Sequence, residues 1–165
     1  MTEQSGRERV LDDAQHHGVE IEFVDRGHAT SLEEAAANLG IEPREIVKTL
    51  VAKTKVTQTA QTHSYLMVLI RGDQQVDWAK LRRAAGVKKA SMAAPDEGFD
   101  ATGYRPGTIT PFGASDDDGE RWPVFADASI SGRICMGAGE PGLNLFVKAA
   151  DLFDAFSVTT ADIAK

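Results

Sequence analysis

The segment of residues 102–113 restricts the fold of this chain more than any other, because twelve residues hold three glycines and two prolines. A helix cannot continue through it, since each proline lacks a backbone N–H and has φ fixed at about −65°. A central strand is equally unfavourable, because glycine and proline both interrupt the hydrogen-bonded ladder. This segment, the Gly/Pro loop, therefore predicts a rigid irregular backbone whose amides and carbonyls can approach a ligand. An ordinary surface loop is the alternative interpretation.

The chain as a whole predicts a single α+β domain over residues 1–165, with a mixed, curved sheet flanked by short helices and residues 1–6 as a flexible tail. Its 165 residues are 42% hydrophobic and 26% charged, which is typical of a globular protein. The apolar runs are too short to span a bilayer, and the polar first residues do not resemble a signal peptide. A single cysteine, Cys135, excludes an internal disulfide and a multi-cysteine metal site. We therefore expect a cytoplasmic protein.

Hydrophobic periodicity and turn residues predict the individual elements. Ser31 and Glu34 form a capping box before a helix that ends at Gly40, and Asp77 begins a second helix that ends at Gly86. Residues 46–52 and 64–70 predict two buried strands joined by an exposed loop. Further helices or helical turns are expected at residues 7–17, 43–46, from 95 and at 149–156, and further strands at 19–24, 87–92, 123–127, 133–136 and 143–147.

The charge distribution bears on nucleic-acid binding. The net charge of −7 argues against a broad, sequence-independent nucleic-acid surface, which needs a strongly basic face. A local basic cluster could still hold one end of an RNA, and a solvated helix face is the alternative. Its members lie within ten residues of one another and are Lys80, Arg82, Arg83, Lys88 and Lys89.

Lys48 is the first candidate for chemistry, because it lies inside an otherwise apolar strand. A lysine there must reach a cleft or be paired, since an unpaired buried charge is costly. At a cleft it can anchor a phosphate or carboxylate, or stabilise an oxyanion. The alternative is a lysine that faces water on a one-sided strand. Thr49 points to the opposite face of a regular strand, so its backbone is the part expected near Lys48.

Other candidates carry weaker signals. Asp127 ends a strand, where both functional carboxylates and ordinary turn formers occur. Gly137, Ala138 and Gly139 form a loop that lets the backbone approach a ligand, and His28 precedes the capped helix near a possible cleft. Cys135 lies in an apolar strand and is interpreted as a core residue. The sequence contains no nucleophile elbow, phosphate-binding loop or zinc-protease motif, and its histidines lack metal-ligand spacing.

Three segments in order, Thr30 to Ala36, Ile46 to Leu50 and Thr102 to Gly113, resemble the YbaK/ProX family of aminoacyl-tRNA deacylases. This family is related to the editing insertion domain of bacterial prolyl-tRNA synthetase. The resemblance continues through Asp127 and residues 137–139 to the helix at Asp151 and covers most of the chain. No single motif is very specific, but the order and spacing are.

The resemblance implies an enzyme that hydrolyses the ester between a wrong amino acid and the 3′ end of a tRNA. It places the essential lysine at Lys48 and the family's Gly-x-x-Pro loop at Gly103 to Pro106. The residues implied to be catalytic are Lys48 and Gly103, and those implied to bind substrate are His28, Thr49, Tyr104, Pro106, Gly107, Asp127, Gly137, Ala138 and Gly139. It also implies no cofactor, because family members use a bound water or the substrate's own side chain.

The resemblance further implies mischarged tRNA as the partner, with prolyl-tRNA synthetase as a second candidate and no membrane or DNA. Thr49 stands where the alanine-specific branch carries asparagine, which favours cysteine or another small amino acid on tRNA(Pro). A non-catalytic module that binds tRNA or a synthetase is the alternative, and hydrolysis of another small aminoacyl ester is a third possibility. The acidic segment 114–122 is expected to form either a mobile flap or a solvated loop.

Overall fold

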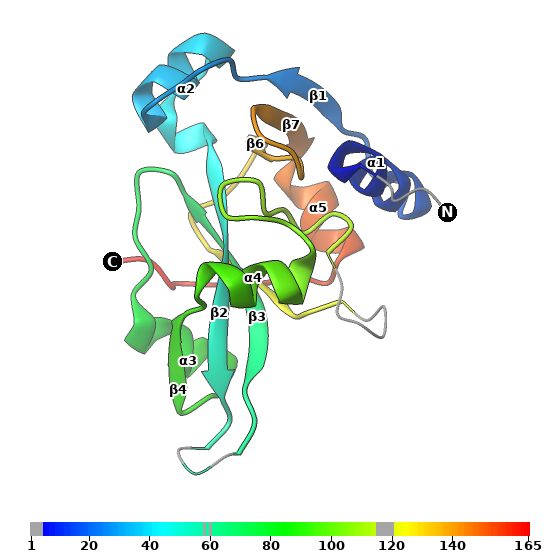
Figure 1. Ribbon diagram of the computed structural model, residues 1–165. Helices are drawn as coiled ribbons and strands as arrows, with labels where there is room; N and C mark the ends of the chain where they lie inside the picture. Colours follow the sequence, from blue (N-terminus) through cyan, green and yellow to red (C-terminus); the bar gives the residue numbers. More distant parts are fainter. Residues whose placement is uncertain (1–4, 58, 60, 115–120) are drawn as a thin grey trace.

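The computed structural model describes residues 5–57, 59, 61–114 and 121–165. Within them the strands form two sheets, one in the order β4-β2-β3-β5-β8 and one in the order β1-β7-β6 (Figure 1). The α+β class expected from the sequence is confirmed, and the strands divide between two sheets. The strands are β1 (Glu22–Asp25), β2 (Val47–Lys55), β3 (Ser64–Arg71), β4 (Lys89–Met92), β5 (Val124–Asp127), β6 (Arg133–Gly137), β7 (Leu143–Lys148) and β8 (Thr159–Ala161).

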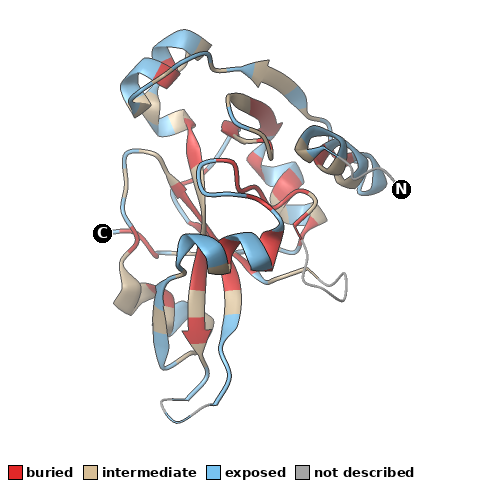
Figure 2. Cartoon of the chain, viewed as in Figure 1, coloured by how far each residue is buried: buried red, intermediate tan, exposed pale blue. Residues whose placement is uncertain are grey.

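The larger sheet is built on the antiparallel pair of β2 and β3, in which Val47 lies opposite Arg71. β4 pairs antiparallel with the last residues of β2, whereas β5 and then β8 add in parallel to β3, so the sheet is mixed. The apolar run of β3 from Leu66 to Ile70 is entirely buried, because side chains pack against both of its faces. Figure 2 shows the buried residues gathered along β2, β3 and the segment after α4.

A backbone bridge and a shared hydrophobic cluster join the smaller sheet to the larger one. β7 pairs antiparallel with both β1 and β6. One parallel bridge, between Ile46 and Cys135, connects the start of β2 to β6. Residues from both sheets and from the Gly/Pro loop, among them Val47, Leu145 and Ile109, share one hydrophobic cluster. The first residues of β2 therefore lie where the two sheets and this loop meet.

The helices α2 (Leu32–Leu39) and α3 (Trp78–Ala85) begin and end where the sequence predicts. Ser31 caps α2, with its hydroxyl accepting from the N–H of Glu34 at 3.1 Å, and Gly40 ends it with φ of 71°. Asp77 caps α3 in the same way. The helices are α1 (Gly6–His16), α2 (Leu32–Leu39), α3 (Trp78–Ala85), α4 (Pro95–Thr102) and α5 (Ala149–Ala155), with a 3-10 turn η1 (Pro43–Glu45). None of the described helices has the length and apolar character that crossing a bilayer requires.

Four details differ from the sequence-based expectation. Thr102 is the last residue of α4, so the irregular part of the Gly/Pro loop begins at Gly103. Ser5 and Gly6 cap and begin α1 instead of forming a tail, because the Ser5 hydroxyl accepts from the N–H of Glu8. β1 begins at Glu22, later than expected, and β8 was not predicted because its three residues carry little periodicity. Most of the acidic segment, residues 115–120, lies outside the described residues.

Candidate functional site

A cleft of about 470 Å³ opens at the edge of β2. β4 pairs with β2 only from Ala52 to Lys55, and β6 bridges the chain only at Ile46, so among the described residues no strand pairs with residues 48–51 on that side. α2, the segment before it, the Gly/Pro loop and the smaller sheet enclose this open edge. The residues that line the cleft are Arg26, Ala29, Thr30, Ser31, Leu32, Ala35, Ile46, Val47, Lys48, Thr49, Leu50, Gly107, Ile109, Gly137 and Asn144.

The open edge also presents backbone groups to the cleft. The carbonyl of Val51 accepts from the N–H of Ala93 at 3.0 Å, on the β4 side of the strand. Backbone groups in a strand alternate in direction, so those of Thr49 point to the same side, beyond the reach of β4. The backbone of Thr49 therefore lies at the cleft, and its part in binding a substrate stays a prediction.

Lys48 lines the cleft with a half-buried side chain. Its Nζ donates to the backbone carbonyl of Gln74 at 2.9 Å. An ammonium group has three N–H donors, so this contact positions the charge and leaves further donors for an anion or a carbonyl oxygen. A lysine in an apolar strand was expected to reach a cleft or to be paired, and Lys48 does both.

Two residues that line the cleft each have a buried side-chain oxygen without a partner. Thr49 Oγ1 and Asn144 Oδ1 are the buried side-chain polar atoms, among those the structure describes, without a hydrogen bond. Asn144 is only 2% exposed, and its Nδ2 donates to Cys135 Sγ at 3.4 Å. Sequence reasoning missed Asn144, because a polar residue in the alternating run 143–147 is typical of a solvent-facing position, whereas the fold buries it.

The Gly/Pro loop reaches the cleft through Gly107 and Ile109. Tyr104 does not line the cleft. It connects two parts of the loop, since its hydroxyl donates to the carbonyl of Phe112 at 2.7 Å. Burial raises the pKa of Tyr104 to about 12. Arg9 lies over the Tyr104 ring at 4.4 Å and donates to the carbonyls of Thr102 and Gly113. These contacts tie the two ends of the loop to each other and to Arg9 of α1.

Several other predicted substrate contacts lie away from the cleft lining. Gly103 follows α4 as its C-cap and is exposed, and Arg9 Nη1 lies 2.5 Å from the place a Cβ would occupy. Pro106 is exposed, Ala138 is fully buried, and Gly139 packs against Tyr104. His28 is exposed beside Ala29, which does line the cleft. The roles assigned to these residues by resemblance stay predictions.

Asp127 fastens the C-terminal segment. Its Oδ1 accepts from the N–H groups of Ile163 and Ala164 at 3.0 and 3.2 Å, and its Oδ2 accepts from the N–H and hydroxyl of Ser129. Burial favours the neutral acid, but these hydrogen bonds outweigh it and lower the pKa of Asp127 from 3.8. These contacts show that the Asp127 carboxylate holds the C-terminal segment in place. Asp127 was predicted to contact substrate, but it does not line the cleft.

Replacing Asp127 with asparagine is expected to lower the free energy of unfolding by about 1–3 kcal/mol, because buried N–H groups lose a charged acceptor. A carboxyl whose folded pKa is depressed contributes stability above its unfolded pKa and loses it as the pH falls through the folded pKa. The wild type should therefore lose stability in acid more steeply than Asp127→Asn. Urea denaturation of both proteins between pH 7 and pH 3 measures this, and parallel curves would contradict it.

Cys135 is fully buried, and burial raises the pKa of its thiol. The interpretation of Cys135 as a core residue agrees with this placement. The described residues contain no group of three histidine, cysteine, aspartate or glutamate side chains arranged to hold a metal ion. The cleft is lined by Lys48, by the edge of β2 and by the two residues whose buried oxygens lack a partner.

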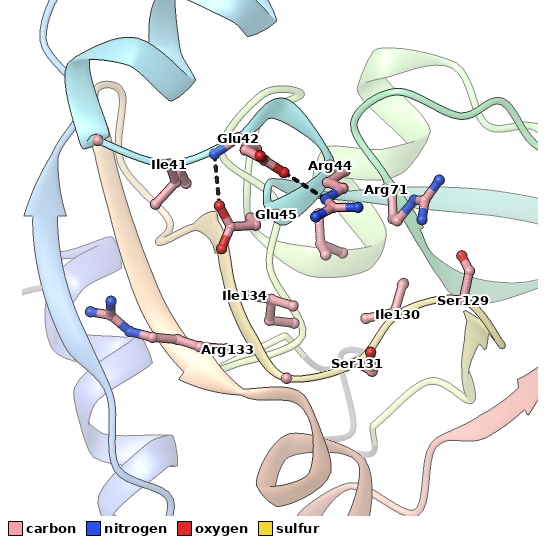
Figure 3. A pocket seen from close by; sticks show the side chains of 13 residues that line it. Ile41, Glu42, Arg44, Glu45, Arg71, Ser129, Ile130, Ser131, Arg133 and Ile134 are labelled. Carbon is pink, nitrogen blue, oxygen red and sulfur yellow. Dashed lines mark hydrogen bonds and ion pairs between the residues drawn. The ribbon is translucent and has the colours of Figure 1, made fainter.

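A larger hollow of about 830 Å³ lies on the other side of the start of β2, between η1 and the segment 129–134 (Figure 3). It contains three arginines, each already paired with a carboxylate: Arg44 with Glu42 at 2.7 Å, Arg71 with Asp73 at 3.2 Å and Arg133 with Glu22 at 3.1 Å. Neither of the unpartnered oxygens lies here, so we place the candidate site in the cleft of Lys48.

The predicted basic cluster lies on α3 and around β4, at the opposite end of β2 from Lys48 (Figure 1). Arg82, Arg83 and Lys88 line a shallow hollow of about 400 Å³. Lys80 is partly neutralised, because its Nζ pairs with Asp162 at 3.0 Å and donates to the carbonyl of Ala164. The structure therefore gathers part of this cluster on one surface and leaves it separate from the cleft.

Comparison with known proteins gives a consistent result. A model of the aminoacyl-tRNA editing domain matches residues 26–155. The proline–tRNA ligase of Bacillus licheniformis is 28% identical over 145 residues, which cover 87% of this chain and 23% of the ligase. That of Shouchella clausii is 31% identical over 130 residues, which cover 78% of this chain and 21% of the ligase. The chain thus spans about a fifth of the length of these curated relatives.

The fold has solved counterparts. A crystal structure provisionally assigned as a trans-editing enzyme for prolyl tRNA synthetase superposes with a TM-score of 0.83. The two sequences are 21% identical, and the match covers 99% of each chain. At this identity the likeness shows a shared fold.

Proposed function

The chain belongs to the aminoacyl-tRNA editing domain family, and from this premise we propose that it is a trans-editing deacylase. It hydrolyses the ester that links a wrongly attached amino acid to the 3′ end of a tRNA. The amino acid is cysteine or another small residue, and the tRNA is tRNA(Pro), which fits the similarity to proline–tRNA ligases.

One observation carries this proposal: Lys48, the strand edge at Thr49 and Gly107 line the same cleft. Its volume of about 470 Å³ lies within the range of about 300–1,000 Å³ that is usual for small-molecule sites. It therefore has room for an aminoacyl group and part of the terminal adenosine. Small side chains at Ala29 and Ala35 leave this room on the α2 side.

The proposed reaction relies on positioning and electrostatic stabilisation. Lys48 binds the ester carbonyl or the terminal phosphate and stabilises the negative charge that develops when water attacks the carbonyl carbon. The N–H groups of the strand edge hold the aminoacyl group in line for this attack. The C–O bond to the ribose then breaks, and the ribose oxygen takes a proton to leave as a hydroxyl.

The direct test is to incubate the protein with tRNA(Pro) charged with cysteine, serine or alanine, and with correctly charged prolyl-tRNA(Pro). We expect at least one mischarged substrate to lose its amino acid at least tenfold faster than the prolyl ester. A folded protein that binds these tRNAs without hydrolysing any of them would instead support a non-catalytic binding module.

The basic cluster on α3 fits the body of the tRNA. The strand from Lys48 to Lys55 extends about 23 Å at about 3.3 Å per residue, so the cluster lies well beyond the reach of the terminal nucleotide. The overall charge of −7 makes this surface the favoured place for phosphate contacts. Lys80 contributes little to the proposed phosphate binding, since its ammonium group is already paired with Asp162.

Reversing the charge of Arg82 and Arg83 together is expected to weaken tRNA binding about tenfold or more at low salt. The dependence of the binding constant on salt should become shallower by about two counterions, since each phosphate contact contributes about one. Hydrolysis of a minimal aminoacyl-adenosine ester should be unaffected, because this small substrate does not extend to α3. Fluorescence anisotropy across a salt series measures the first two effects, and an unchanged salt slope would exclude this surface.

A further inference from the structure

Thr49 Oγ1 and Asn144 Oδ1 require an explanation, because a buried polar atom without a partner normally costs about 1–3 kcal/mol. Nearly all such atoms in folded proteins are paired. The two atoms come from different strands, β2 and β7, and both residues line the Lys48 cleft. A ligand group in this cleft can supply the missing partner, whereas an apolar group cannot.

The surroundings of Asn144 define what it can recognise. Phe146 lies two residues along β7 on the same face, and Val24 lies directly opposite Asn144 on β1. Cys135, Phe146, Ala35 and Ile46 form a hydrophobic cluster on this side of the sheet. The amide nitrogen of Asn144 already donates to Cys135 Sγ. What remains is a carbonyl oxygen, an acceptor in an otherwise apolar part of the cleft.

The chemistry of the missing partner follows from these surroundings. The charged α-ammonium group of an amino acid needs several acceptors and is costly to bury in an apolar environment. A hydroxyl is neutral, and it donates one hydrogen bond while accepting others. A hydroxyl therefore has the chemistry that both atoms lack, since it can donate to an acceptor such as Asn144 Oδ1 and accept from a donor such as the Thr49 hydroxyl. A methyl group satisfies neither atom, and a thiol is a weaker donor than a hydroxyl.

We propose that Asn144 and Thr49 recognise the side-chain hydroxyl of the esterified amino acid, so that the cleft selects seryl over cysteinyl and alanyl esters. This inference rests on the proposed function and names its substrate class. A site built to hydrogen-bond a substrate group discriminates strongly against analogues that lack it, because its own polar atoms are then left unpaired. We expect kcat/KM for the seryl ester to exceed that for the alanyl ester about tenfold to hundredfold, with the cysteinyl ester between them.

The test is the ratio of kcat/KM for seryl and alanyl esters in the wild type and in two variants. Asn144→Leu and Thr49→Val remove the polar atoms at similar side-chain size, and each should lower this ratio at least fivefold. Thr54→Val is the matched control, since Thr54 is a buried threonine of the same strand whose hydroxyl already donates to the carbonyl of Ser64. It should leave the ratio at the wild-type value even if it lowers stability.

Ratios in Asn144→Leu and Thr49→Val equal to that of the wild type would overturn the inference, as would a wild type that prefers the alanyl ester. A wild type that hydrolyses none of the esters would contradict the proposed function instead. In that case the recognition of the side-chain hydroxyl is tested by measuring the binding of non-hydrolysable analogues. In these analogues serine or alanine is joined through an amide to 3′-amino-3′-deoxyadenosine. Tighter binding of the seryl analogue, lost in Asn144→Leu, supports the recognition, and equal binding of the two analogues contradicts it.

Discussion

Replacing Lys48 with methionine is expected to reduce kcat/KM for deacylation of mischarged tRNA by about a hundredfold to a thousandfold. Methionine keeps most of the length of the side chain but removes the charge that stabilises the developing oxyanion or holds the phosphate. Arginine should restore only a small part of the activity, because its planar guanidinium does not reproduce a compact ammonium held by the Gln74 carbonyl. Single-turnover hydrolysis by wild type, Lys48→Met and Lys48→Arg measures these differences.

Lys53 provides the matched control for Lys48. It is a lysine of the same strand, and its Nζ pairs with Glu97 at 2.9 Å outside the cleft. Lys53→Met removes the same charge from β2 and should keep activity within about twofold of the wild type, since Lys53 does not line the cleft. Thermal unfolding of every variant separates loss of catalysis from loss of fold. A folded Lys48→Met with activity within tenfold of the wild type would exclude the proposed role of this lysine.

The placement of Lys48 at a cleft could be predicted, because a charged side chain in an apolar strand must reach solvent or a partner. The helix bounds at Ser31, Gly40, Asp77 and Gly86 were predictable for a similar reason, since capping depends on a few neighbouring residues. The open edge of β2 could not be predicted. It exists because β4 is short and pairs only beyond Ala52, and pairing between distant strands leaves no local signal.

The Gly/Pro loop was predictable in its backbone character but not in the direction of its residues. Its composition predicts a rigid irregular backbone, and the contacts around Tyr104 agree. The sequence does not indicate which of its residues face a ligand. Gly107 and Ile109 line the cleft, whereas Tyr104 supports the loop, because the direction of each side chain depends on packing against α1 and the two sheets. Asn144 was missed since its neighbour Cys135 and the cleft beside it come together only in the fold.

Replacing Tyr104 with alanine is expected to lower the free energy of unfolding by about 3–5 kcal/mol, the usual cost of removing a buried aromatic ring. Tyr104 is 2% exposed and packs in the main hydrophobic cluster with Phe112 and Ile109. The variant should also lose deacylation activity, because Gly107 and Ile109 are no longer held against the cleft. Urea denaturation and single-turnover hydrolysis on the same preparations measure both effects.

Tyr104→Phe separates the hydroxyl of Tyr104 from its ring. It leaves the buried carbonyl of Phe112 without its donor and should cost about 1–3 kcal/mol. Its pH dependence gives an independent check, since burial raises the pKa of Tyr104 from 10.0 to about 12. The unfolded chain then ionises first, so wild-type stability is complete below pH 10 and decreases by about 3 kcal/mol as the pH rises to about 12. Tyr104→Phe should lack this component, and the stability difference between the two proteins should shrink over that range. A constant difference would show that Tyr104 is not buried as described, and that the loop is held in another way.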